Sequence, residues 1–246
     1  MDLISKLISS FDPATPNFRP TELYNESWLI KIVLHQASEI TDDDFIIGFS
    51  PESTWFSEGL LPTAFKERFK GDKLSESRTN ADGVIGHINI GQRAKADLEL
   101  KENAKQFTVV EAKVGSPLSS GVIHAKYFDQ AARNIACIAE VLAKAGIEPS
   151  SLVRLSFVVL APQYSIDKGT FTREIDPESI QSKVRKRVNA YGGELDDWYK
   201  DHFEPTLNRI NIQSLSWESA LGWISKYKPV EAVKLKEYYE LCLRYK

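Results

Sequence analysis

Apolar residues recur at helical spacing in two long stretches of the chain. Residues 22–36 and 122–144 carry apolar side chains three and four positions apart, which predicts helices with one buried face. Between them, short runs that alternate or are rich in β-branched residues predict three strands, at 83–90, 95–101 and 107–114. The stretch from 50 to 78 has no clear period and is left without an assigned element.

The apolar run at 152–160 predicts a buried strand after the second long helix. A strand, a long helix and a further strand indicate a parallel crossover, so the sheet should be mixed. The last third predicts mainly helices, at 177–190, 196–202, from 216 and from 230, with one strand at 210–215. No linker or repeat divides the chain. We therefore expect one α/β domain over 1–246, with a core at about 20–162 and a C-terminal elaboration at about 163–246.

Composition narrows the class of protein. The 246 residues are 42% hydrophobic and 26% charged, which are globular proportions, and no run approaches the roughly 18 to 20 apolar residues of a membrane-spanning helix. Cys137 and Cys242 lie in helix-like segments and do not suggest a disulfide framework, so a cytoplasmic location is expected. The net charge of -3 excludes a protein that binds polyanions through bulk charge, so nucleic-acid binding would need a local basic patch.

A pair of carboxylates follows from the alternation in two of the predicted strands. If 95–101 and 107–114 form a hairpin with their apolar faces on the same side, Leu98 lies opposite Val110 and Asp97 lies opposite Glu111. Directly opposed residues of antiparallel strands have Cβ atoms about 4.5 to 5.5 Å apart, where like charges are destabilising. A magnesium ion would offset this repulsion, because Mg²⁺ commonly takes one or two carboxylates and keeps several waters. Lys113, on the same face, could orient the attacking water and offset charge on phosphorus.

Asp97 followed by Glu111-Ala112-Lys113 resembles the motif of the PD-(D/E)XK nuclease superfamily, which includes restriction endonucleases. The order helix, three strands, helix, strand over about 22–160 is also similar to the core of that family. Ala96 departs from the pattern, since the family has proline before the aspartate. The resemblance implies a restriction-endonuclease-like fold and a Mg²⁺-dependent nuclease, with Mn²⁺ as a substitute, that cleaves DNA in a restriction, defence or repair setting.

The resemblance also implies roles for individual residues. Asp97 and Glu111 would bind the metal, and Lys113 would assist the attacking water. A carboxylate on the first helix often completes the site, and Glu26 is the better match because it shares a helix face with Leu23, Ile30 and Val33. On the helix after the motif, Gln130 matches the supporting glutamine. Asp82, in the Asp-Gly pair before the first predicted strand, is a rival carboxylate but is first of all a turn signal.

Basic residues that could contact a phosphate backbone occur in two places. They are Lys126 and Arg133 on the second long helix, and the C-terminal cluster Lys183, Arg185, Lys186 and Arg187. The same residues could simply be solvated helix faces.

The alternative to a nuclease is a non-catalytic module of the same fold that binds nucleic acid or protein. A third possibility is a hydrolase of another phosphate ester. For an enzyme that cuts both strands of a duplex, a homodimer is the usual assembly.

Overall fold

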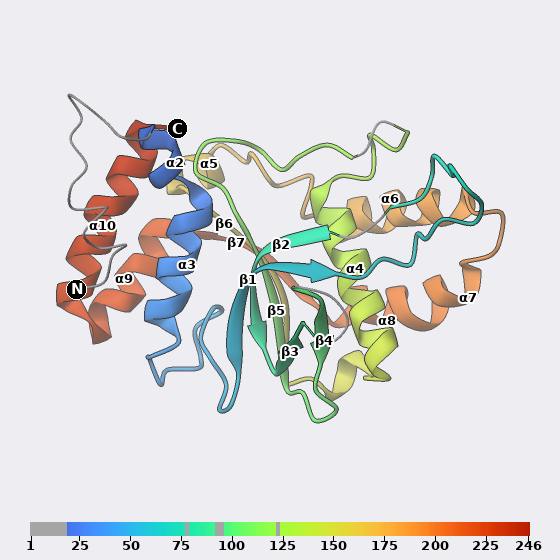
Figure 1. Cartoon of the computed structure of the whole chain (residues 1–246), viewed down its shortest axis with the longest axis horizontal. Coiled ribbons are helices and arrows are strands. Elements are labelled where there is room, and N and C mark those ends of the chain that lie inside the picture. The colour runs from blue at the N-terminus through green and yellow to red at the C-terminus, as the bar shows by residue number, and fades with distance from the viewer. Residues whose placement is uncertain (1–18, 77–78, 92–95, 122–123) are drawn as a thin grey trace.

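A five-stranded mixed β-sheet forms the centre of the molecule (Figure 1). The computed structural model describes residues 19–76, 79–91, 96–121 and 124–246. The sheet has the order β1-β2-β5-β6-β7, and its strands are β1 (Thr54–Leu61), β2 (Thr79–Gly86), β5 (Gln106–Ala112), β6 (Arg154–Ala161) and β7 (Asn211–Ser216). The pairs β1–β2 and β2–β5 are antiparallel, whereas β5–β6 and β6–β7 are parallel. The predicted α/β class with a mixed sheet is confirmed.

Helices cover both faces of this sheet. One face packs against α3 (Glu26–Ala37), α9 (Trp217–Tyr227) and α10 (Pro229–Arg244), with the short α2 (Pro20–Leu23) just before α3. The other face carries α4 (Gln130–Ala145), α6 (Pro177–Asn189), α7 (Asp196–Trp198), the π-helical turn η2 (Tyr199–Phe203) and α8 (Glu204–Arg209). The 3₁₀ turn η1 (Pro149–Ser151) precedes β6, and α5 (Gln163–Asp167) follows it. Within the described residues, no helix is long and apolar enough to cross a membrane.

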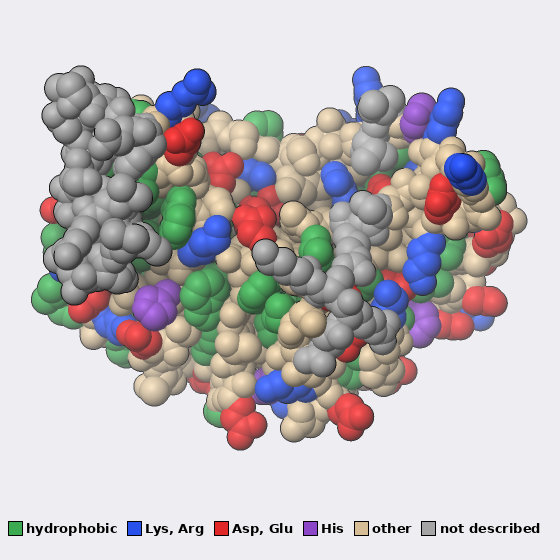
Figure 2. All heavy atoms as spheres, viewed as in Figure 1, with side chains coloured by type: hydrophobic (Ala, Val, Ile, Leu, Met, Phe, Trp, Pro, Cys, Tyr) green, Lys and Arg blue, Asp and Glu red, His purple; other side chains and the backbone are tan. Residues whose placement is uncertain are grey.

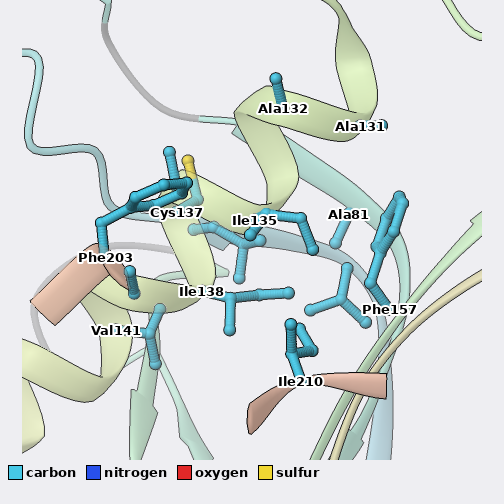
Figure 3. Packing of buried hydrophobic residues seen from close by; sticks show 14 of the residues in the cluster. Ala81, Ala131, Ala132, Ile135, Cys137, Ile138, Val141, Phe157, Phe203 and Ile210 are labelled. Atoms are coloured by element: carbon cyan, nitrogen blue, oxygen red, sulfur yellow. The ribbon is translucent and has the colours of Figure 1, made fainter. Parts of the chain in front are cut away.

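Alternation along β5 assigns each of its side chains to one of the two faces. Phe107 and Val109 belong to the core beneath α4, while Val110 and Ala112 belong to the core beneath α3 and α9. Figure 3 shows how α4 fills the first of these cores, with Ile135, Ile138 and Val141 directed toward the sheet and its neighbours. By the same alternation Glu111 lies on the α4 face, near the end of a strand that is buried at every position.

The two long helices of the sequence pattern are present but begin later than predicted, and a side-chain cap explains each start. Asn25 accepts a hydrogen bond from the main-chain N–H of Trp28 and opens α3, so that 20–37 is broken into α2 and α3. Asp129 accepts from the N–H of Ala132 and opens α4, which therefore starts at Gln130 and not at 122.

The predicted hairpin between 95–101 and 107–114 is wrong. Residues Leu98–Leu100 form β4, which pairs with β3 (Ile88–Ile90) in a separate two-stranded sheet. The antiparallel neighbour of β5 is β2, in the register Gly83↔Val110. The alternation in 98–100 is still explained by burial. Leu98 and Leu100 are buried in the core beneath α4, although β4 is not a strand of the central sheet. Strand β1, in the stretch without a clear period, supplies the edge next to β2.

Candidate active site

Glu111 is the centre of a buried polar cluster at the carboxyl end of β5. Its side chain is fully buried, and its Oε1 lies 2.7 Å from Nζ of Lys113, two residues along the chain. The amide of Gln130 also donates to Oε1, and the amide of Asn134 donates to Oε2 at 3.3 Å. Each carboxylate oxygen of Glu111 thus has a donor, which is what a buried carboxylate requires.

The first turns of α4 position the two amides. Because Asp129 caps the helix, Gln130 is its first residue and Asn134 follows four positions later on the same face. Gln130 is held in turn by Ser119, whose main-chain N–H donates to Gln130 Oε1 at 3.0 Å and whose carbonyl accepts from the Gln130 N–H at 3.0 Å. The orientation of Gln130 is therefore set from both sides. The structure brings together the predicted residues Glu111, Lys113 and Gln130.

Asp82 is the second carboxylate of the cluster. One step beyond the pair Gly83↔Val110, the β2–β5 register places Asp82 opposite Glu111. Asp82 Oδ2 accepts a hydrogen bond from the main-chain N–H of Ala112 at 2.8 Å, so the side chain replaces a main-chain acceptor where the two strands separate. Burial, and next the charge of Asp82, raise the pKa of Glu111 to about 8, while Lys113 opposes this shift.

Asp97 does not lie opposite Glu111, contrary to the prediction. It forms a bridge with Leu60 of β1, and β1 and β2 both lie between it and β5. Three strand spacings of about 4.8 Å separate the two backbones by about 14 Å. Asp97 lines a small pocket with Lys144 near the end of α4, whereas Glu111 contacts Gln130 at the start of that helix. Asp97 and Glu111 are too far apart to share a magnesium ion, whose ligands lie about 2.1 Å away.

Glu26 is partly buried at the start of α3, where its neighbour in the structure is Cys242 of α10. Burial, and next the Glu26 charge, raise the pKa of the Cys242 thiol to about 12. The next residue, Ser27, donates a hydrogen bond at 2.9 Å to Glu58 of β1. Glu58 has a φ of 57° and occupies the β1 position between Ser57↔Gly83 and Gly59↔Ala81, which is opposite Asp82. Ser27 and Glu58, rather than Glu26, connect α3 with the Asp82 position.

The predicted basic cluster is divided among different surroundings. Arg187 is fully buried, with its guanidinium bonded to the Leu74 carbonyl and 3.4 Å from Glu76, so its predicted role in nucleic-acid contact is wrong. The buried guanidinium packs among the rings of Phe65, Phe128 and Tyr191. The sequence pattern of basic residues does not reveal which of them is paired with a buried carboxylate in the folded protein.

The other residues that were predicted to contact nucleic acid have different surroundings. Lys183 forms an ion pair with Asp129 at 2.7 Å, and Arg185 lies 3.5 Å from the centre of the Tyr199 ring. Lys126 and Lys186 are exposed. Arg133 lies close enough to Glu76 and Cys137 for its charge to lower the pKa of both groups, against the larger opposite effect of burial.

The sequence pattern did not assign two members of the cluster to the site. Asn134 lies four residues after Gln130 in the polar stripe of the helix, and this spacing was the available signal. Asp82 was considered only as a rival, because its importance depends on β2 being the neighbour of β5.

The donor set fits a hard divalent cation. Asp82 and Glu111 offer carboxylate oxygens on adjacent strands, and the Asn134 Oδ1 atom is buried nearby without a hydrogen-bond partner. Among the residues that the structure describes, no group of three or more His, Cys, Asp and Glu side chains is arranged to hold a metal. A magnesium ion here would rest on two carboxylates with water as the remaining ligands, which is its usual arrangement.

Comparisons with known proteins do not assign this chain to a family. No family model, no curated protein and no solved structure matches it.

Proposed function

We propose that this protein is a Mg²⁺-dependent nuclease of the PD-(D/E)XK type that hydrolyses phosphodiester bonds, with DNA as the favoured substrate. In this proposal Asp82 takes the place that the sequence pattern assigned to Asp97. The observation that carries it is the meeting of Asp82, Glu111 and Lys113 at the point where β2 and β5 separate. Two antiparallel strand pairs followed by a parallel crossover through α4 support a restriction-endonuclease-like core.

Asp82 and Glu111 would hold the cation. When bound, Mg²⁺ would offset the charge of the phosphate and lower the pKa of a coordinated water. Gln130 and Asn134 fix the Glu111 carboxylate from α4, so that its oxygens do not have to reorganise during the reaction. Asp82 is fixed by the main-chain N–H of Ala112. The chain therefore supplies a preorganised pair of carboxylates.

Lys113 is the residue suited to the reacting water. Its ammonium lies 2.7 Å from Glu111 Oε1 and retains further N–H donors for a water or a phosphate oxygen. In hydrolysis the water loses a proton as its oxygen bonds to phosphorus, the P–O bond to the leaving sugar oxygen breaks, and that oxygen takes up a proton in turn. Lys113 would orient the water and offset the negative charge that develops on the phosphate oxygens.

The test is a cleavage assay on linear, circular, single-stranded and duplex DNA and on RNA, each with Mg²⁺, Mn²⁺ or EDTA. We expect cleavage that requires the metal and that decreases by about 100-fold or more in Lys113→Ala, the range of general acid–base effects. Because Lys113 is buried and paired with Glu111, its removal should also lower stability, so a thermal melt must establish that the variant is folded at the assay temperature.

Two results would overturn the proposal. One is nucleic-acid binding without cleavage under every metal condition, which would favour the non-catalytic module. The other is cleavage that persists in EDTA or in Lys113→Ala.

A further inference from the structure

A groove of about 820 Å³ lies between α6 and the residues that lead into α4. Lys126, Tyr127 and Asp129 line one side of it, and Lys183 and Lys186 line the other. Asp129 is directly followed by Gln130, whose amide contacts Glu111. The groove therefore begins one residue from the cluster that holds Asp82, Glu111 and Lys113.

The face of α6 that borders the groove is a continuous polar stripe. Its members Ser179, Ser182, Lys183 and Lys186 have the spacing of one helix face, and Glu178 in the first turn of α6 also lines the groove. Arg185 leaves this stripe and packs on Tyr199 near Glu204, and Arg187 points into the core. Two of the four cations of the predicted basic cluster therefore line the groove, and the other two lie elsewhere.

Four carboxylates also line the groove, namely Asp129, Glu174, Asp176 and Glu178, and two of them are already engaged. Asp129 accepts from the N–H of Ala132 and forms an ion pair with Lys183, and Asp176 accepts from the N–H of Ser179. Lys126, Arg173 and Lys186 are exposed along the same groove. Elsewhere on the face seen in Figure 2, Lys and Arg are mixed with Asp and Glu, without one broad basic field. Because the net charge of the chain is -3, phosphate binding would depend on local cations such as these and not on bulk charge.

One aromatic ring is placed among these cations. The Lys186 ammonium lies 4.1 Å from the centre of the Tyr127 ring, which is partly exposed. Proteins that bind single strands combine cations along the backbone with aromatic rings on which bases stack. The groove also has the size of small-ligand sites, about 300 to 1,000 Å³, so it could take a short piece of one strand but could not enclose a duplex.

We propose that this groove binds a short single-stranded segment of nucleic acid next to the phosphate that is cleaved. The proposal rests on the proposed nuclease function for the position of that phosphate. Lys126, Lys186 and Arg173 would contact backbone phosphates, and Tyr127 would stack on a base.

The test measures binding of a short fluorescein-labelled single-stranded oligodeoxynucleotide, and of its duplex, in EDTA over a series of salt concentrations. The groove variant is Lys126→Ala with Lys186→Ala. The matched control is Lys200→Ala with Lys226→Ala, which removes the same charge from exposed positions outside the groove. Thermal melts establish that each variant is folded.

For the single strand, we expect the groove variant to bind at least tenfold more weakly at low salt. Its slope of log affinity against log salt should fall by about 1.4, because each lost phosphate contact on a single strand removes about 0.7. The control should bind within about twofold of wild type.

Equal losses in the two variants would show a bulk-charge effect and overturn the proposal, as would unchanged binding in the groove variant or absence of single-strand binding. A groove variant that loses duplex binding as strongly as single-strand binding would overturn the single-strand assignment. Because binding is measured in EDTA, these outcomes do not depend on cleavage. Failure of the cleavage assay would reject the nuclease while leaving the groove measurement intact.

Discussion

The Asp82–Glu111 pair and the Asp97 region lie at opposite ends of α4. Glu111 contacts Gln130 and Asn134 in the first turns of the helix, whereas Asp97 shares a pocket with Val141 and Lys144 in its last turns. At about 1.5 Å per residue, the helix positions 130 and 144 are about 21 Å apart. Both regions combine carboxylates with a lysine.

Their surroundings differ in a way that bears on chemistry. Glu111 is fully buried, sits near the positive end of the α4 dipole and has donors from three side chains. Asp97 follows Ala96, which has a φ of 65°, in a turn that joins β1 through a single bridge. Residue type and spacing suggest candidate carboxylates, whereas the segments that pack around Glu111 decide which of them lies beside it. Four measurements test this contrast.

The largest contrast is expected in the cleavage rate of paired aspartate variants. Asp82→Asn should lower kcat by about 100-fold or more, since a weakened metal site removes several kcal/mol of transition-state stabilisation and each 1.4 kcal/mol is about tenfold. Asp97→Asn should stay within about threefold of wild type. Initial rates on plasmid DNA with Mg²⁺ measure both. A reversed order, with Asp97→Asn inactive and Asp82→Asn active, would reject the assignment of Asp82.

The pH dependence of stability should be the next largest effect. Burial and the Asp82 charge raise the pKa of Glu111 to about 8 in the folded protein, whereas an unfolded Glu titrates near about 4.3. The folded state then binds the extra proton between these values, so stability is full below about pH 4 and decreases as the pH rises toward 8. The decrease should be up to about 5 kcal/mol.

Urea denaturation in EDTA between pH 5 and 8 measures this change in the free energy of unfolding. Glu111→Gln, which removes the titrating group, should show a much flatter profile. Parallel profiles for the two proteins would mean that Glu111 does not titrate in this range.

Magnesium should stabilise the two aspartate variants differently. A cation that binds only the folded state adds about 3 kcal/mol at 100 times its Kd. Wild type and Asp97→Asn should both gain this, and Asp82→Asn should gain much less. Thermal melts over a Mg²⁺ series supply the comparison. An equal response in Asp82→Asn would show that the ion binds elsewhere.

The smallest expected effect concerns the metal-free protein near pH 8. Replacing Asp82 by Asn removes charge repulsion with Glu111 while retaining an oxygen that can accept from the Ala112 N–H. Stability in EDTA should therefore be unchanged or rise by up to about 1 kcal/mol, the scale of a cross-strand pair. Denaturant melts of Asp82→Asn, with Asp97→Asn as the control, test it. A large loss of stability in Asp82→Asn would identify Asp82 as a structural residue.

The sequence by itself determined the α/β class with its mixed sheet, and it pointed to three residues that the structure brings together. The run at 152–160 is apolar at nearly every position, which is typical of a strand buried on both faces, and it forms β6 parallel to β5. Glu111 and Lys113 are two residues apart at the end of β5 and contact each other, and Gln130 opens the following helix. These relations are local or follow from burial, so the amino-acid pattern contains them.

Only the tertiary structure decided which carboxylate lies beside Glu111 and which basic residues face solvent. The segments 83–90 and 95–101 both alternate in a way that could pair with β5, and a period of two cannot choose between them. In the structure β2 pairs with both β1 and β5, whereas Leu98 and Leu100 are buried under α4. Likewise Arg187 is buried because Glu76, far away in sequence, lies within reach of it. Register and burial of charge depend on partners that meet only when the whole core is packed.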